Sequence, residues 1–481
     1  MQTNINWNPG IVAKLLLIQS LFVEQFGMMT LAAVAKAEGH EVALAIGSDK
    51  HILQRANEFK PDVVGFSVLT GYQKRYLQIG QALKRDITPK PLILFGGPHA
   101  TFFPRVVLEK GVDIVCRGEG EGALLDILDA VDSGKDTVGI DNTAVNQSGE
   151  LKAFPMRPLV DLDKIPFPDR TLYKDYPIIH DSDMVTFMAS RGCPFSCSFC
   201  FNKDMVNMVK DLGSWVRFRS VDNLTEEIAL VQRTKKIRYI DFHDDTFILK
   251  RKWLFEFLDA YASRFSTPFT CNIRADLVTL DVAKALKVAG CCRVSFGLES
   301  GDEKLRNLLL KKSLKDDQIR EAADVLHQVN IPFFTYNMIG LPGERLEDAF
   351  KTLELNVEIG TQCAWTSVFQ PFPGTELADY CLEKGFLDKP ISTDKPVDTH
   401  TTSLLNQPDI DKIVRLQKFA YIGVRFPSTL PLIKKLINYN LPTVYYYIHR
   451  ISYLLLYFRK AYQTNLAGTL KHAWIAWRHY R

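Results

Sequence analysis

"SRGCPFSCSFCFNK", residues Ser190 to Lys203, places Cys193, Cys197 and Cys200 within eight residues of one another. Three thiolates on one short loop can bind a soft metal. Structural zinc normally has four protein ligands, whereas this loop supplies only three cysteines. An iron–sulfur cube held by three cysteines keeps one iron without a protein ligand, and that iron can hold a small molecule. The alternative is a loop that carries three structural thiols.

The loop follows the first of six apolar segments that alternate with amphipathic helical patterns, for example at 314–329 and 345–359. Six such repeats predict a partial (β/α)6 barrel whose chemistry lies at the carboxyl ends of its strands. The three-cysteine loop would therefore lie on the active face. The six segments read MVTFMAS, IRYIDFH, FTCNIR, RVSFGLES, FFTYNMIG and AWTSVFQ.

The first 135 residues alternate five apolar runs with helical patterns. Continuous apolar runs are typical of buried parallel strands, so an α/β fold with an N-terminal doubly wound, Rossmann-like parallel sheet is predicted. Ligands of such sheets bind at the carboxyl ends of the strands. The expected organisation is the following: the sheet domain in 1–150, a proline-rich linker in 151–182, the barrel in 183–400 and a basic helical tail in 401–481.

Composition narrows the class of protein. Hydrophobic residues make up 46% of the 481 residues and charged residues 24%, which is ordinary for a globular protein. The nine cysteines argue against a secreted disulfide framework, because their number is odd. Neither an apolar run long enough to span a membrane nor a signal peptide is evident in the sequence, so a cytoplasmic location is expected.

Charge is concentrated in the tail. From Lys412 onward the chain has twelve Lys or Arg and no Asp or Glu, whereas the other 411 residues hold 47 basic and 55 acidic residues. Tyr, Trp and Leu are interleaved with the basic residues, as in helices that lie in a membrane interface. The tail is therefore predicted either to contact an anionic membrane peripherally or to form a helical lid across the barrel mouth. A nucleic-acid partner is not expected, since no binding motif accompanies the charge.

The C-x3-C-x2-C pattern resembles the signature of the radical S-adenosylmethionine enzymes, and the resemblance extends from Met184 to about Phe386. It implies that the three cysteines bind a 4Fe-4S cluster whose open iron is chelated by S-adenosylmethionine. It also implies a 5′-deoxyadenosyl radical and an external electron donor of the flavodoxin or ferredoxin type. Phe199 matches the aromatic position beside the adenine.

Further motifs of this resemblance fall at the predicted strand ends. In "DFHDD", Asp244 and Asp245 are candidates for binding the amino group of S-adenosylmethionine, and strand-end capping is the alternative. In "FGLES", Glu299 and Ser300 fall where the family contacts ribose and carboxylate. Arg274 is predicted either to meet a carboxylate or to form a surface ion pair.

The N-terminal sheet carries "SVL" (Ser67 to Leu69) at one strand end and "GGPHAT" (beginning Gly96, Gly97) at the next. The pair resembles the later motifs of cobalamin-binding domains, and the resemblance implies that these four residues contact cobalamin. Glycines would let the backbone approach the ligand closely.

One position departs from the cobalamin pattern. Where that family has the histidine that ligates cobalt, this chain has Glu24. The resemblance therefore implies cobalamin without a histidine on cobalt, and His99 in the glycine loop is the alternative ligand.

Together the two resemblances predict a cobalamin-dependent radical S-adenosylmethionine enzyme that methylates an unactivated carbon. The alternatives are a radical cyclase or rearrangement enzyme that uses cobalamin, and a non-catalytic cobalamin or redox sensor. The expected substrate is a small or lipid-like molecule. No catalytic residue is assigned beyond the cofactor motifs.

Overall fold

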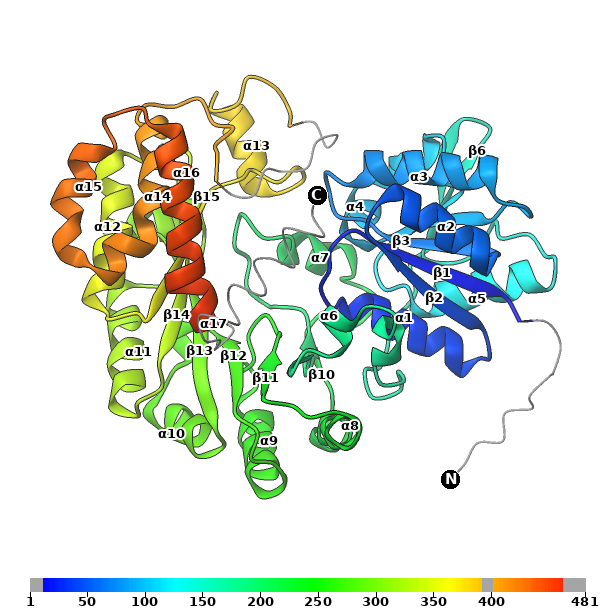
Figure 1. Cartoon of the computed structure of the whole chain (residues 1–481), viewed down its shortest axis with the longest axis horizontal. Helices are drawn as coiled ribbons and strands as arrows, with labels where there is room; N and C mark the ends of the chain where they lie inside the picture. Colours follow the sequence, from blue (N-terminus) through cyan, green and yellow to red (C-terminus); the bar gives the residue numbers. More distant parts are fainter. Residues whose placement is uncertain (1–11, 392–400, 462–481) are drawn as a thin grey trace. The chain divides into compact units, whose positions relative to one another are not determined.

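The computed structural model describes residues 12–391 and 401–461, which form two compact units (Figure 1). The first unit runs to Ser182 and includes Asp211–Ser214. The second unit contains Asp183–Lys210 and most of the chain after Trp215. Each unit has its own sheet and its own hydrophobic core.

The first unit is built on a seven-stranded sheet of order β2-β1-β3-β4-β5-β6-β7. The five leading strands are parallel, as predicted, and the last two are antiparallel. The strands are β1 (Lys14–Gln19), β2 (Glu41–Ile46), β3 (Val63–Ser67), β4 (Leu92–Gly96), β5 (Ile114–Cys116), β6 (Thr143–Gln147) and β7 (Glu150–Ala153).

Both faces of the parallel part are buried, which explains the unbroken apolar runs. In β1, Leu15 and Leu17 belong to one core cluster, and Leu16 and Ile18 belong to the cluster on the other face. Helices α1 and α5 supply the first cluster, and α2 and α3 supply the second. The helices of this unit are α1 (Phe26–Ala37), α2 (Asp49–Phe59), α3 (Gln73–Asp86), α4 (Gly97–Phe102), η1 (Pro104–Leu108), α5 (Glu121–Asp132), η2 (Arg170–Tyr173) and α6 (Pro177–His180).

The β6–β7 hairpin was not predicted from the sequence. Its loop is Ser148-Gly149, with φ values of 56° and 90°, and two residues with positive φ are typical of a tight type I′ hairpin turn. The first unit therefore has two more strands than the five predicted. β7 begins at residue 150, where the sequence predicted the end of the sheet domain. The predicted domain limits stay predictions.

The second unit contains a sheet of six parallel strands in the order β15-β14-β13-β12-β11-β8. The partial (β/α)6 architecture is thereby confirmed. A separate short antiparallel pair, β9 (Ser190–Arg191) with β10 (Arg217–Phe218), lies beside the cysteine loop. The six strands are β8 (Met184–Phe187), β11 (Tyr239–Phe242), β12 (Phe269–Ile273), β13 (Cys291–Glu299), β14 (Phe333–Ile339) and β15 (Cys363–Val368).

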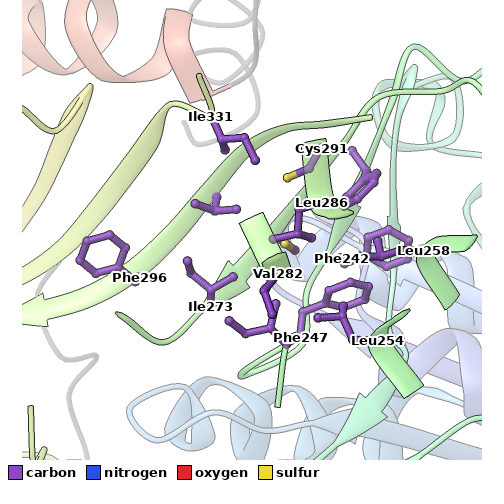
Figure 2. Packing of buried hydrophobic residues seen from close by; sticks show 14 of the residues in the cluster. Phe242, Phe247, Leu254, Leu258, Ile273, Val282, Leu286, Cys291, Phe296 and Ile331 are labelled. Atoms are coloured by element: carbon purple, nitrogen blue, oxygen red, sulfur yellow. The ribbon is translucent and has the colours of Figure 1, made fainter. Parts of the chain in front are cut away.

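The largest core lies between these strands and the helices that follow them, and Figure 2 shows part of it. Phe242 of β11 stacks on Phe247 with ring centroids 4.6 Å apart. The helix α8 begins after Ser220, whose hydroxyl accepts a hydrogen bond from the Asn223 N–H. The helices are α7 (Asn202–Met208), α8 (Val221–Thr234), α9 (Arg251–Arg264), η3 (Ala275–Leu277), α10 (Leu280–Val288), η4 (Leu305–Leu309), α11 (Asp316–Gln328), α12 (Leu346–Glu358) and α13 (Glu376–Glu383).

The tail helices belong to the second unit, where α14 lies between α12 and α16 (Figure 1). Ile413, Phe419 and Tyr445 are buried in one core cluster with residues of α12. Tyr239 at the start of β11 donates a hydrogen bond from its hydroxyl to the Ala461 carbonyl, 3.3 Å away. The end of the described tail therefore lies near the amino ends of strands, not across the barrel mouth. The tail elements are α14 (Ile410–Arg425), η5 (Pro427–Thr429), α15 (Leu430–Leu436), α16 (Pro442–Ser452), η6 (Tyr453–Phe458) and α17 (Arg459–Ala461).

Candidate functional site

The three cysteines lie on one loop that follows β9, at the carboxyl end of the barrel. Burial raises the pKa of the Cys193, Cys197 and Cys200 thiols, and each thiol also interacts electrostatically with another of the three. Among the described residues, no group of three His, Cys, Asp or Glu side chains is arranged around a single metal ion. An iron–sulfur cube sets a different requirement, because each thiolate binds its own iron. The three neighbouring thiols fit such a cluster.

Hydrogen bonds of Ser198, which lies between the second and third cysteines, hold the cysteine loop in place. Its N–H donates to the Leu310 carbonyl at 3.0 Å, and its hydroxyl donates to the Leu309 carbonyl at 2.6 Å. Its own carbonyl accepts from the Leu377 N–H at 3.0 Å. A serine with every polar group engaged holds the thiols in fixed positions.

The two aspartates of "DFHDD" have different environments. Asp244 is fully buried and accepts hydrogen bonds from the Ala189 N–H and the Ser190 hydroxyl, and its burial raises its pKa to about 6. This is the strand-end cap, the second of the two predicted roles. Asp245 is exposed and interacts electrostatically with Cys193 and Cys200. Asp245 is therefore the carboxylate beside the thiols.

The side chain of Arg274 is engaged in contacts inside the protein, around the cysteine loop. Its guanidinium lies 3.8 Å from the ring centroid of Phe195, inside the cysteine loop. Its Nε donates to Asp276 Oδ1 at 2.7 Å, and it also donates to the Lys312 carbonyl. With its side chain 6% exposed, Arg274 joins the cysteine loop to the 312–313 segment through the cation–π contact with Phe195 and hydrogen bonds to the backbone carbonyls of that segment.

Glu299 ends β13 with a φ of 67°, which turns its backbone out of the strand. Its carboxylate lies 2.7 Å from Lys312 Nζ, and both side chains are only 11% exposed. The charges of Glu299, Lys312 and Arg274 all act on the Cys197 thiol. Lys312 is a site residue that sequence reasoning missed, because it follows no motif and only the fold brings it to the cluster loop.

Ser300 is completely buried and its carbonyl accepts a hydrogen bond from Arg306 at 2.7 Å. Its hydroxyl accepts from the Asp302 N–H at 3.2 Å. Ser300 therefore holds the turn after β13.

Phe199 packs against the hydrophobic cluster that contains Leu341, two residues after the end of β14. Nearby, the buried Glu344 accepts hydrogen bonds from the Gly340 and Leu341 N–H groups, and burial raises its pKa to about 8.

The candidate cobalamin motifs meet at the carboxyl edge of the first sheet. Ser67 pairs with Gly96 in the parallel register of β3 and β4. Gly97 has a φ of 87°, and a Cβ there would lie 2.9 Å from the Val68 nitrogen and 3.3 Å from Ser67 Oγ. Leu69 follows with 39% of its surface exposed. The backbone cradle that these residues form fits a ligand that needs close approach.

Gly97→Ala is expected to lower the affinity for cobalamin on the order of tenfold, because the new Cβ pushes the Val68 backbone out of place. Gly134→Ala is the matched control, since Gly134 also has a positive φ, 65°, but nothing within 4 Å of its Cβ position. Absorbance titration with hydroxocobalamin measures both. Equal affinities would contradict the cradle.

His99 is engaged in packing. It is 2% exposed, its ring stacks on Phe103 with centroids 5.2 Å apart, and its Nδ1 lies 3.2 Å from Thr70 Oγ1. Burial lowers its pKa to about 4. Glu24, at the position of the missing histidine, forms a 3.4 Å ion pair with Arg170, and both side chains are largely buried. These contacts favour cobalamin without a histidine on cobalt.

Known protein families match both units of the chain. Residues 20–128 match the B12 binding domain, and residues 188–355 match the Radical SAM superfamily. The two matches together cover more than half of the chain. An uncharacterized methyltransferase of Pyrococcus horikoshii is 28% identical over 75% of this chain and 79% of its own length. An anaerobic magnesium-protoporphyrin IX monomethyl ester cyclase of Rubrivivax gelatinosus is 26% identical over 77% of this chain and 66% of its own.

Among solved structures, the radical S-adenosylmethionine methyltransferase TsrM of Kitasatospora setae, with cobalamin and a [4Fe-4S] cluster bound, has a similar fold. Its TM-score is 0.63 at 17% identity, covering 81% of this chain and 80% of TsrM. The chain belongs to the cobalamin-binding radical S-adenosylmethionine enzymes. Its cofactors are accordingly a 4Fe-4S cluster, S-adenosylmethionine and cobalamin.

Proposed function

We propose that the chain transfers a methyl group to an unactivated carbon of a small-molecule substrate. The observation that carries the proposal is the set of three neighbouring thiols at the carboxyl end of a radical-enzyme barrel, in a chain that also has a B12 binding domain. The bound cofactors supply hydrogen abstraction and a transferable methyl group. The residues of the chain hold these cofactors and exclude water from them.

A role in holding the cofactors is proposed for each candidate residue. Cys193, Cys197 and Cys200 bind the cluster. Asp245, exposed beside the thiols, accepts hydrogen bonds from the amino group of S-adenosylmethionine. Glu299 contacts its ribose while Lys312 keeps the carboxylate in place at 2.7 Å.

Three residues position the others. Asp244 caps the strand end before the cysteine loop, Arg274 clamps that loop through Phe195, and Ser300 fixes the turn behind Glu299. Phe199 packs where the adenine is expected. In the first unit, Ser67, Leu69, Gly96 and Gly97 bind cobalamin. An electron donor of the flavodoxin or ferredoxin class reduces the cluster.

Mass spectrometry of extracts tests the reaction. A strain that expresses the chain should contain a metabolite one methylene heavier than its precursor, and a strain with the Cys200→Ala variant should contain only the precursor. A new product of unchanged carbon count, with a ring or a rearranged skeleton, would instead support the cyclase alternative. The cyclase relative is the observation that keeps this alternative in view.

We also propose that the chain works in the cytoplasm, a reducing compartment, because none of its nine cysteines forms a disulfide in the structure. None of the helices in the described ranges is both long and apolar enough to cross a bilayer.

A peripheral membrane contact through the tail is proposed from the side chains that α15, α16, η6 and α17 leave exposed. Val444, Tyr447, Ile451 and Leu455 are 42–59% exposed and recur every three or four residues, which puts them on one helix face. Exposed basic residues accompany them, and no acidic residue occurs in the chain after Asp411. This combination suits an anionic lipid surface, to which each basic residue contributes about 1 kcal/mol. The basic residues are Lys434, Lys435, Arg450, Arg459 and Lys460.

Flotation with anionic vesicles at low salt is expected for the full chain, and the double variant Tyr447→Ser, Ile451→Ser should float several-fold less. Val288→Ser is the control, because Val288 is 80% exposed on α10, outside the tail. Substitutions are preferable to truncation, since Ile433 and Tyr445 lie in the core and their loss would unfold it. A full chain that stays at the bottom of the gradient would contradict the membrane contact.

A further inference from the structure

Asn202 begins α7, two residues after Cys200, and is only 3% exposed. Its Nδ2 lies 3.5 Å from Cys200 Sγ and 3.1 Å from Asp245 Oδ2. Its Oδ1 accepts a hydrogen bond from the Trp215 indole N–H at 2.9 Å. All the polar atoms of this buried amide are therefore engaged, and one N–H points at a cysteine sulfur.

The direction of that N–H follows from chemistry. An indole nitrogen can only donate a hydrogen bond, so the amide oxygen must face Trp215. An ionised Asp245 can only accept, so the amide nitrogen must face that carboxylate. Turning the amide over would place donor against donor and acceptor against acceptor. The group offered to Cys200 is therefore an N–H donor.

Trp215 is itself held in place. Gly192, immediately before the first cysteine, has a φ of 87°, and a Cβ there would lie 2.5 Å from the Trp215 carbonyl and 2.8 Å from its ring. The pairing of β9 with β10 anchors both segments, because β9 ends at Arg191 and β10 begins at Arg217. Only glycine permits this approach. The indole is therefore a fixed support for the amide beside the sulfur.

We propose that Asn202 is a positioning residue that sets the reduction potential of the cluster through its hydrogen bond to the Cys200 sulfur. The inference rests on the proposed role of Cys200 as an iron ligand. Uptake of one electron from the external donor increases the negative charge on the cluster and its sulfurs. An N–H donor stabilises that charge, and hydrogen bonds to sulfur are among the factors that set the potentials of iron–sulfur clusters. Asn202 therefore makes the cluster easier to reduce.

The test uses the full chain with a reconstituted cluster and a redox titration followed by electron paramagnetic resonance. Asn202→Leu keeps the branched shape of four heavy atoms but removes the donor, and should shift the midpoint potential to more negative values. At a fixed potential the ratio of reduced to oxidised cluster should fall roughly three- to tenfold, the range expected for one lost hydrogen bond of ordinary strength. Trp215→Phe keeps a ring but frees the amide, and should give a smaller shift in the same direction.

Iron content separates this inference from the proposed function. A wild-type chain that takes up no iron would refute the role of Cys200 and the inference with it. A full iron content with an unchanged potential in Asn202→Leu would overturn the inference alone. If Asn202→Leu cannot hold the cluster, Trp215→Phe decides: a negative shift supports the positioning role, and an unchanged potential overturns it.

Discussion

Replacing Cys200 with alanine is expected to abolish the cluster and with it all cleavage of S-adenosylmethionine. Wild-type protein purified without oxygen should contain about four irons per chain, by the ligation of a cube through three thiolates. The remaining two thiolates cannot compensate, because Ser198 fixes the positions of the loop. The same loss is expected for Cys193→Ala and Cys197→Ala. Iron analysis and the charge-transfer absorption of the cluster measure the effect.

Cys292→Ser is the control for this prediction. Cys292 is half-buried on β13, where its thiol donates to the Phe269 carbonyl at 3.2 Å, and it should be dispensable for the cluster. Unchanged iron content in any of the three alanine variants would refute the assignment of the motif. Loss of iron in Cys292→Ser would show that iron content reports folding and not ligation.

The largest expected effect on stability comes from Arg306, which is completely buried in η4. Its Nε donates to the Leu314 carbonyl and another nitrogen donates to the Ser300 carbonyl, both at 2.7 Å, and it pairs with Asp316. Arg306→Leu would leave the Ser300 carbonyl without its donor and Asp316 without its buried partner, while the Leu314 carbonyl would keep only the Asn307 amide as donor. The free energy of unfolding of the second unit should fall by roughly 3–5 kcal/mol.

Urea denaturation followed by tryptophan fluorescence measures this loss, because Trp253 and Trp365 both lie in the second unit. Arg306→Lys keeps the charge and should lose less. The turn after β13 carries Glu299, so Arg306→Leu should also weaken binding of S-adenosylmethionine. A midpoint that does not move would mean that the buried hydrogen bonds contribute little to stability.

The sequence predicted the architecture well where hydrophobicity alone decides it. The five parallel strands of the first sheet are mostly apolar runs with buried side chains, such as β1, and the barrel strands follow the predicted alternation with helices. The β6–β7 hairpin escaped prediction because its strands are short and its exposed positions are polar. Hydrophobic patterns in a sequence indicate strands whose side chains are buried. An edge hairpin buries few side chains and therefore shows little of such a pattern.

The roles of the candidate site residues could be predicted less well from the sequence than the fold. Asp244 and Asp245 are identical neighbours in the sequence, and only the fold decides that the first caps a strand end while the second is exposed beside the thiols. Lys312 and Asn202 belong to no motif, and they reach the site because the chain turns at Glu299 and enters α7. Tertiary contacts of this kind leave no periodic trace in the sequence.

One chain is expected to use the cluster, S-adenosylmethionine and cobalamin together, and analysis of the reaction products tests this joint use. Reconstituted protein is incubated without oxygen with S-adenosylmethionine, hydroxocobalamin and a strong reductant, and products are quantified by mass spectrometry. We predict both 5′-deoxyadenosine and S-adenosylhomocysteine in the wild type. Cys200→Ala should form no 5′-deoxyadenosine, and omission of cobalamin should abolish S-adenosylhomocysteine. Absence of both products from protein that carries its full iron and cobalamin would contradict the account.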